Sequence, residues 1–66
     1  MEKEKIGLNA GLIWQKMEVK GEMSINELKK ITKLDVKQLY LALGWLAREN
    51  KVLLNSDKEE LHISLL

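Results

Sequence analysis

Several residue types that often hold a small domain together are missing from this 66-residue chain. It has no cysteine, so neither disulfides nor thiolate metal sites are available to it, and it has no proline. No segment approaches the ~18 consecutive apolar residues of a membrane span, and the charged N-terminal sequence MEKEK is unlike a signal peptide. We therefore expect one small cytoplasmic domain over residues 1–66, with residues 1–5 frayed.

The chain also lacks a strong charge of either sign. Its 11 Lys and Arg nearly balance its 10 Asp and Glu, which gives a net charge of +1 and a pI of about 8.0. Nucleic-acid modules are often more basic, with a pI above ~9, because their affinity comes largely from neutralised phosphates. DNA binding by this chain would therefore depend on a local cluster of positive charge.

What the chain does have is two helix starts close together. Ser24 is followed three residues later by Glu27, and Asp35 is followed in the same way by Gln38. Each pair is a capping box, in which the first side chain accepts from a first-turn amide and the second reaches back. The ten residues between the two caps leave room for a short helix and a turn only. This is the geometry of a helix-turn-helix.

Apolar spacing predicts which side of each helix is buried. The first helix of the pair buries Ile25 and Leu28 together with Ile31 or Thr32. The core positions predicted for the second helix are Val36, Leu39, Ala42, Leu43, Leu46 and Ala47.

A further helix is expected earlier in the chain. Asn9 is its predicted N-cap, and it runs to Lys20, where Gly21 ends it as a left-handed C-cap. Its predicted core residues are Ala10, Ile13, Trp14 and Met17.

Short strands complete the predicted fold. Residues 22–23 are expected to form one, Lys51 to Asn55 a second and Glu60 to Leu65 a third, with turn residues SDKE between the last two. The order helix, strand, helix, helix, strand, strand predicts a mainly α fold with a small β-hairpin. This is a winged helix-turn-helix with three helices and a two- or three-stranded wing.

Three segments of the chain resemble a known family. They are AGLIW at 10–14, ELKK at 27–30 and ALGWLARE at 42–49, of which the last is the most specific because Gly-Trp is unusual within a helix. They resemble small bacterial winged helix-turn-helix proteins of unknown function from Bacteroides-type organisms, over about residues 6–54. The resemblance implies the fold and a homodimer, and it implies no established ligand and no catalytic residues. Leu12 stands where such proteins are expected to have a polar residue.

Candidate DNA contacts lie around the turn and on the outer face of the second helix. Four lysines against two acidic residues give residues 24–40 a local balance of +2, which favours phosphate contacts, although an ordinary solvated surface would look the same. Arg is a frequent reader of guanine, and Gln can pair with adenine. The candidate contacts are Lys29, Lys30, Lys33, Lys37, Gln38, Leu41 and Arg48.

Other features favour a protein partner. The loop containing Asp57, Lys58, Glu59 and Glu60 has a balance of −2, and phosphates would repel it. Gly44 lies within a helix, where glycine costs about 1 kcal/mol relative to alanine. Close approach of a partner's backbone would offset this cost, and so would relief of packing against the hairpin. The candidate partner contacts are Leu12, Leu41, Gly44 and Trp45.

No catalytic arrangement can be identified, so we expect no enzyme. His62 is the only histidine and has only Glu60 close by, so we expect no metal, cofactor or small-molecule ligand. Two hypotheses remain open. The first is a DNA-binding transcriptional regulator that acts as a homodimer on double-stranded DNA. The second is a protein-interaction module on a winged-helix scaffold, without DNA binding.

Overall fold

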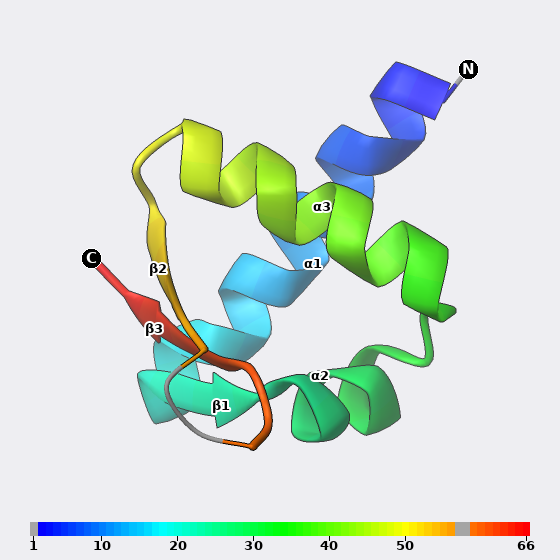
Figure 1. Cartoon of the computed structure of the whole chain (residues 1–66). Helices are drawn as coiled ribbons and strands as arrows, with labels where there is room; N and C mark the ends of the chain where they lie inside the picture. The colour runs from blue at the N-terminus through cyan, green and yellow to red at the C-terminus, as the bar shows by residue number, and fades with distance from the viewer. Residues whose placement is uncertain (1, 57–58) are drawn as a thin grey trace.

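The computed structural model describes residues 2–56 and 59–66. The chain begins with helix α1 (Glu2–Lys20), strand β1 (Glu22–Ser24) and helix α2 (Ile25–Thr32). It continues with helix α3 (Val36–Arg48), strand β2 (Val52–Asn55) and strand β3 (His62–Leu65). Figure 1 shows α3 crossing in front of α1, with α2 below it and the sheet beside the lower end of α1. The predicted order of elements and the predicted fold class are confirmed.

Helix α1 is longer than predicted at its N-terminal end. It begins at Glu2, so the prediction of a start at Asn9 is wrong. Two acidic residues, Glu2 and Glu4, lie in the first turn, where their charge complements the positive end of the helix. The other end is as predicted, because Gly21 has a φ of +81° and its N–H donates to the Met17 carbonyl at 2.6 Å.

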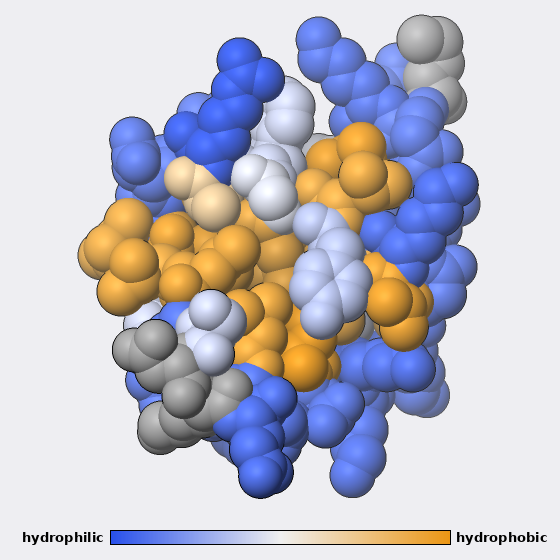
Figure 2. All heavy atoms as spheres, in the orientation of Figure 1, coloured by the Kyte–Doolittle hydropathy of each residue, from blue (hydrophilic) through white to orange (hydrophobic). Residues whose placement is uncertain are grey.

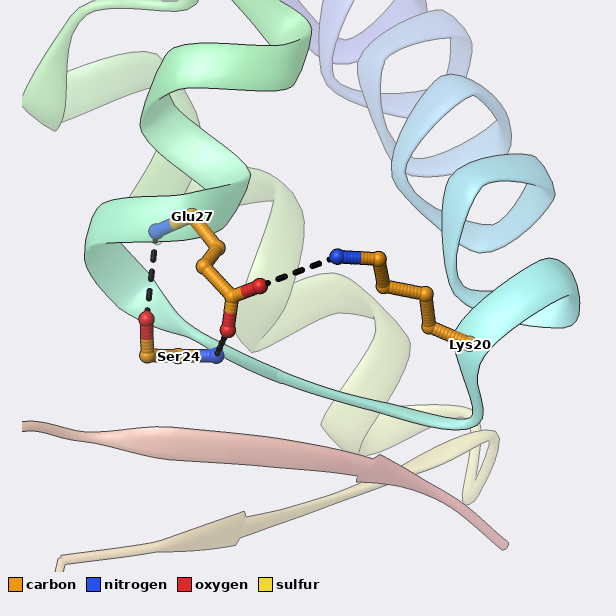
Figure 3. Close-up of polar contacts among 3 residues, drawn as sticks. All are labelled: Lys20, Ser24 and Glu27. Carbon is orange, nitrogen blue, oxygen red and sulfur yellow. Dashed lines mark hydrogen bonds and ion pairs between the residues drawn. The ribbon is translucent and has the colours of Figure 1, made fainter.

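The N-caps predicted for α2 and α3 form, but only the one at α2 is a full capping box. The Ser24 hydroxyl accepts from the Glu27 N–H at 3.1 Å, and the Glu27 carboxylate accepts from the Ser24 N–H at 3.2 Å (Figure 3). At α3 the Asp35 carboxylate accepts from the Gln38 N–H at 2.8 Å. The two caps set α2 and α3 as separate helices with three residues between them.

The core lies between the three helices and one face of the sheet. Most predicted core residues are buried there, and Met23 of β1, which was not predicted, joins them. Thr32 is buried and Ile31 is 40% exposed, and the buried Thr32 hydroxyl is satisfied because it donates to the Leu28 carbonyl at 2.7 Å. The fully buried large side chains are Ile13, Met17, Met23, Leu28, Leu39, Leu43 and Ile63.

One core prediction is wrong and three are met only in part. Val36, in the first turn of α3, is 49% exposed. Trp14, Ile25 and Ala47 are partly buried and pack against the core. The helical spacing placed these residues near the core side, but it does not show where the neighbouring elements end.

The sheet has the order β1-β3-β2, and both ladders are antiparallel. Successive residues of the central strand, β3, form their backbone hydrogen bonds alternately with β1 and with β2. The Leu65 N–H donates to the Gly21 carbonyl on the β1 side, and the Leu66 N–H donates to the Lys51 carbonyl on the β2 side, both at 3.1 Å. Odd-numbered residues of β3 therefore bond to β1 and even-numbered ones to β2.

Candidate nucleic-acid interface

The turn between α2 and α3 is built by local side-chain and backbone bonds. Lys33 adopts the left-handed conformation, with a φ of 59°, and its N–H donates to the Lys29 carbonyl at 3.0 Å. The Thr32 hydroxyl accepts from the Leu34 N–H at 3.3 Å. These bonds satisfy the end of α2 and direct the chain to Asp35, which caps α3.

All four candidate lysines are exposed around this turn. Lys29 and Lys30 lie in the last turn of α2, Lys33 is its C-cap, and Lys37 lies in the first turn of α3. In the part of the chain that the structure describes, none of the four ammonium groups takes part in an ion pair. These predicted phosphate contacts are thus exposed at and around the α2–α3 turn.

The outer face of α3 carries the other candidate contacts. Arg48 and Gly44 are exposed, Gln38 is partly buried, and Leu41 is 38% exposed. This face is less polar than a typical base-reading surface, because Leu41 lies on it and Tyr40, 49% exposed, lies next to it on α3. Figure 2 shows hydrophobic atoms gathered across the side of the molecule where α3, β2 and β3 face the viewer.

The candidate partner contacts are not all on one surface. Trp45 lines a groove toward α1, Leu12 is partly buried on α1, and neither Leu12, Leu41 nor Gly44 lines that groove. One explanation for Gly44, relief of packing against the hairpin, is wrong, because a Cβ at this position would meet nothing within 4 Å.

The wing is acidic where it is described. Glu59 and Glu60 are exposed, and a Glu60 carboxylate oxygen accepts from the Asn26 side-chain amide at 2.7 Å, which ties the loop to α2. The prediction of an acidic loop also involved Asp57 and Lys58, which lie outside the described residues. His62 is engaged locally, since its Nδ1 lies 3.1 Å from the Glu60 carbonyl oxygen.

A groove that sequence reasoning missed opens between α1 and α3, with a volume of about 440 Å³. Its lining includes Gly7, Gly11, Trp14, Trp45, Glu49 and Lys51. The Lys51 ammonium lies 5.8 Å from the centre of the Trp14 ring, so a cation–π contact already occupies one aromatic face. The spacing of Gly7, Gly11 and Trp14 along one side of a helix is the sequence signal that could have indicated it.

One acidic group has a shifted pKa. The hydrogen bond from the Ser24 N–H lowers the pKa of Glu27, and the Lys20 ammonium, 3.2 Å from the carboxylate, lowers it further (Figure 3). Glu27 is thereby held ionised at the junction of α1, β1 and α2. This charge supports the fold and does not belong to the lysine cluster.

Among residues 2–56 and 59–66, no three His, Asp or Glu side chains come together as a metal site would require. Within the same residues, no helix combines the length and apolar character needed to cross a membrane.

The chain matches a known protein family and is similar to a protein of known structure. The family described as "Winged helix-turn-helix domain (DUF2582)" matches residues 1–65. The chain is similar to protein BT2368 from Bacteroides thetaiotaomicron, known from a solution NMR structure, with 38% sequence identity and a TM-score of 0.86. The match covers 98% of this chain and 79% of that one. No curated protein matches the chain at a significant level.

Proposed function

Because the chain belongs to the DUF2582 family of winged helix-turn-helix domains, we propose that it binds double-stranded DNA as a homodimer and acts as a transcriptional regulator. The observation that carries this proposal is the cluster of four exposed lysines around the α2–α3 turn. Winged helix-turn-helix domains place the second helix of the pair in the major groove, with the first crossing the backbone.

In this arrangement the lysines hold phosphates and the outer face of α3 meets base edges. The N-terminal amides of α3 add a partial positive charge beside Lys33 and Lys37. Gln38, Leu41 and Arg48 would face the groove. The acidic wing would stay away from the backbone, so contact would come from the helices alone.

A single copy has little charge with which to bind, and a second copy doubles the phosphate contacts. Half-sites one helical turn apart are separated by about 34 Å. One copy measures 33 × 22 × 21 Å, so two copies arranged end to end along the longest dimension would have about the spacing of adjacent half-sites. Four lysines on each of two copies would give a slope of about −7 for log K against log salt.

The test is a titration of duplex DNA over a series of salt concentrations, followed by fluorescence anisotropy. The double variant Lys33→Glu/Lys37→Glu should abolish binding. The matched control is Lys3→Glu/Lys5→Glu, which changes net charge equally but lies on the N-terminal part of α1, away from α2 (Figure 1). Absence of binding by the wild-type chain at ~50 mM salt, or equal losses in both variants, would refute the proposal.

A second candidate function is a protein-interaction module without DNA binding. The observation that favours it is the apolar side of the molecule formed by α3, β2 and β3 (Figure 2), to which α3 and β2 contribute the exposed leucines Leu41, Leu53 and Leu54. Its proposed contacts are Leu12, Leu41, Gly44, Trp45 and the β2–β3 hairpin. A stable complex that shows no affinity for DNA at low salt would support this function over the first.

A further inference from the structure

Strand β2 is an unprotected edge of the sheet. It lies at the end of the order β1-β3-β2, and its sequence VLLN contains neither a charge nor a proline. Natural edge strands usually carry such residues, because the unpaired backbone of an edge can pair with another strand. The other edge, β1, carries Glu22 and runs directly into α2.

The hydrogen bonds of the sheet show which groups of β2 are open. Because the Leu66 N–H bonds to Lys51 and the register pairs Leu53 with Ser64, Lys51 and Leu53 direct their backbone groups toward β3. Alternation then directs the N–H and C=O groups of Val52 and Leu54 to the open side of the strand.

We propose that a second copy of this chain pairs with β2 along this edge, β2 against β2 in antiparallel orientation. The open groups are self-complementary about a two-fold axis. Val52 lies opposite the partner's Leu54, Leu54 lies opposite the partner's Val52, and each pair exchanges two backbone hydrogen bonds. The two three-stranded sheets become one sheet of twice the width. This inference rests on the proposed function only in taking the homodimer as the active form.

Side chains favour the same register. Leu53 is 54% exposed and falls on the two-fold axis, opposite the partner's Leu53 in a pair without hydrogen bonds. Residues in such a pair have Cα atoms about 4.5 Å apart, so the two leucines pack directly on each other. Lys51 falls opposite the partner's Asn55, so no like charges meet at the ends of the strand.

The surface beside the strand adds the area that a dimer needs. A stable interface buries about 800 Å² on each partner, which is about a sixth of the 4637 Å² surface of this chain. Four residues cannot supply that area alone. Two further exposed apolar side chains lie next to Leu53 and extend the contact. Leu54 of β2 is 39% exposed, and Leu66, whose N–H bonds to the Lys51 carbonyl beside β2, is 72% exposed.

The first test is the oligomeric state without DNA, measured by sedimentation equilibrium over a range of concentrations. The wild-type chain should be a dimer, and Leu53→Lys should be a monomer because two ammonium groups would face each other on the axis. Leu8→Lys is the matched control, since Leu8 is 75% exposed but lies on α1, and it should remain a dimer. A monomeric wild type, or a dimeric Leu53→Lys, would overturn the proposal.

The second test uses the wild-type chain alone and does not depend on the folding of any variant. Amide hydrogen exchange at Val52 and Leu54 should be slow in the dimer and should become faster on dilution. Exchange at Leu53 should stay slow throughout, because its N–H is directed toward β3 in both states. Fast exchange at Val52 and Leu54 in a solution of dimer would show that the copies meet elsewhere.

These outcomes are independent of DNA binding. If the Lys33→Glu/Lys37→Glu chain still dimerises while losing DNA, both proposals stand. If the wild-type chain dimerises through β2 and binds no DNA, the proposed regulator fails and the interface stands. If it binds DNA as a monomer, the interface fails and DNA recognition stands.

Discussion

Replacing Gly11 or Gly44 by alanine is expected to stabilise the fold. Both glycines lie within helices, Gly11 in the middle of α1 and Gly44 in α3, and a Cβ at either position would meet nothing within 4 Å. Glycine in a helix costs about 1 kcal/mol relative to alanine, mainly because the unfolded chain has more freedom to lose. No close contact within one copy requires glycine at these positions, so nothing there offsets the cost.

The expected size of the effect is about 1 kcal/mol for each substitution and about 2 kcal/mol for both, because the sites lie on different helices. The free energy of unfolding of a domain of this size is about 3–10 kcal/mol, so the gain is a substantial fraction of the total stability. For small domains 1 kcal/mol shifts Tm by about 4–8 °C. The double variant should therefore melt about 8–16 °C higher than the wild type.

The assay is thermal and urea denaturation followed by circular dichroism. Gly21→Ala is the control of opposite sign, because Gly21 has a φ of +81° and alanine is strained there. It should lose about 1 kcal/mol or more. A lower free energy of unfolding for Gly11→Ala or Gly44→Ala would refute the reasoning, since it would show that the fold needs a residue without a side chain at that position.

Three further substitutions test the core, the second cap and the charge at the first cap. Leu28→Ala removes a fully buried side chain and should cost about 2–5 kcal/mol in urea denaturation; a loss below ~1 kcal/mol would contradict its burial. Asp35→Ala should cost about 1 kcal/mol by the same measurement, because the Gln38 N–H loses its acceptor, and an unchanged midpoint would show that the cap contributes nothing. Glu27→Gln should be less stable than the wild type at neutral pH. Because the folded pKa of Glu27 lies below its ordinary value of 4.5, this difference should vanish as pH falls through the folded pKa. A difference that persists in strong acid would contradict the charge assignment.

Local chemistry made much of the fold predictable. Ser24, Asp35 and Gly21 fix helix ends through bonds to residues a few positions away, so their roles can be inferred from spacing alone. Burial was less predictable because it depends on which elements meet. Val36 has core spacing but is half exposed in the first turn of α3, and Met23 is buried where β1 pairs with a strand forty residues later.

The candidate functional surfaces were also predictable only in part. The lysines around the turn could be found from the sequence, because their positions follow from the two caps. The open edge of β2 could not, since the strand order and the alternation of hydrogen bonds depend on long-range pairing. The α1–α3 groove was missed for a related reason, as its two walls come from helices far apart in the chain.

The position of β3 has a consequence for how the molecule assembles. It is the last strand in the chain and lies between the other two, so neither β1 nor β2 has a hydrogen-bonding neighbour until β3 has been synthesised. The helices can collapse early, whereas the sheet must close a loop that joins Glu22 to Ser64. Until β3 pairs with them, β1 and β2 have no partner strand. A ribosome-bound chain that stops short of residue 62 would therefore form the helices without the sheet.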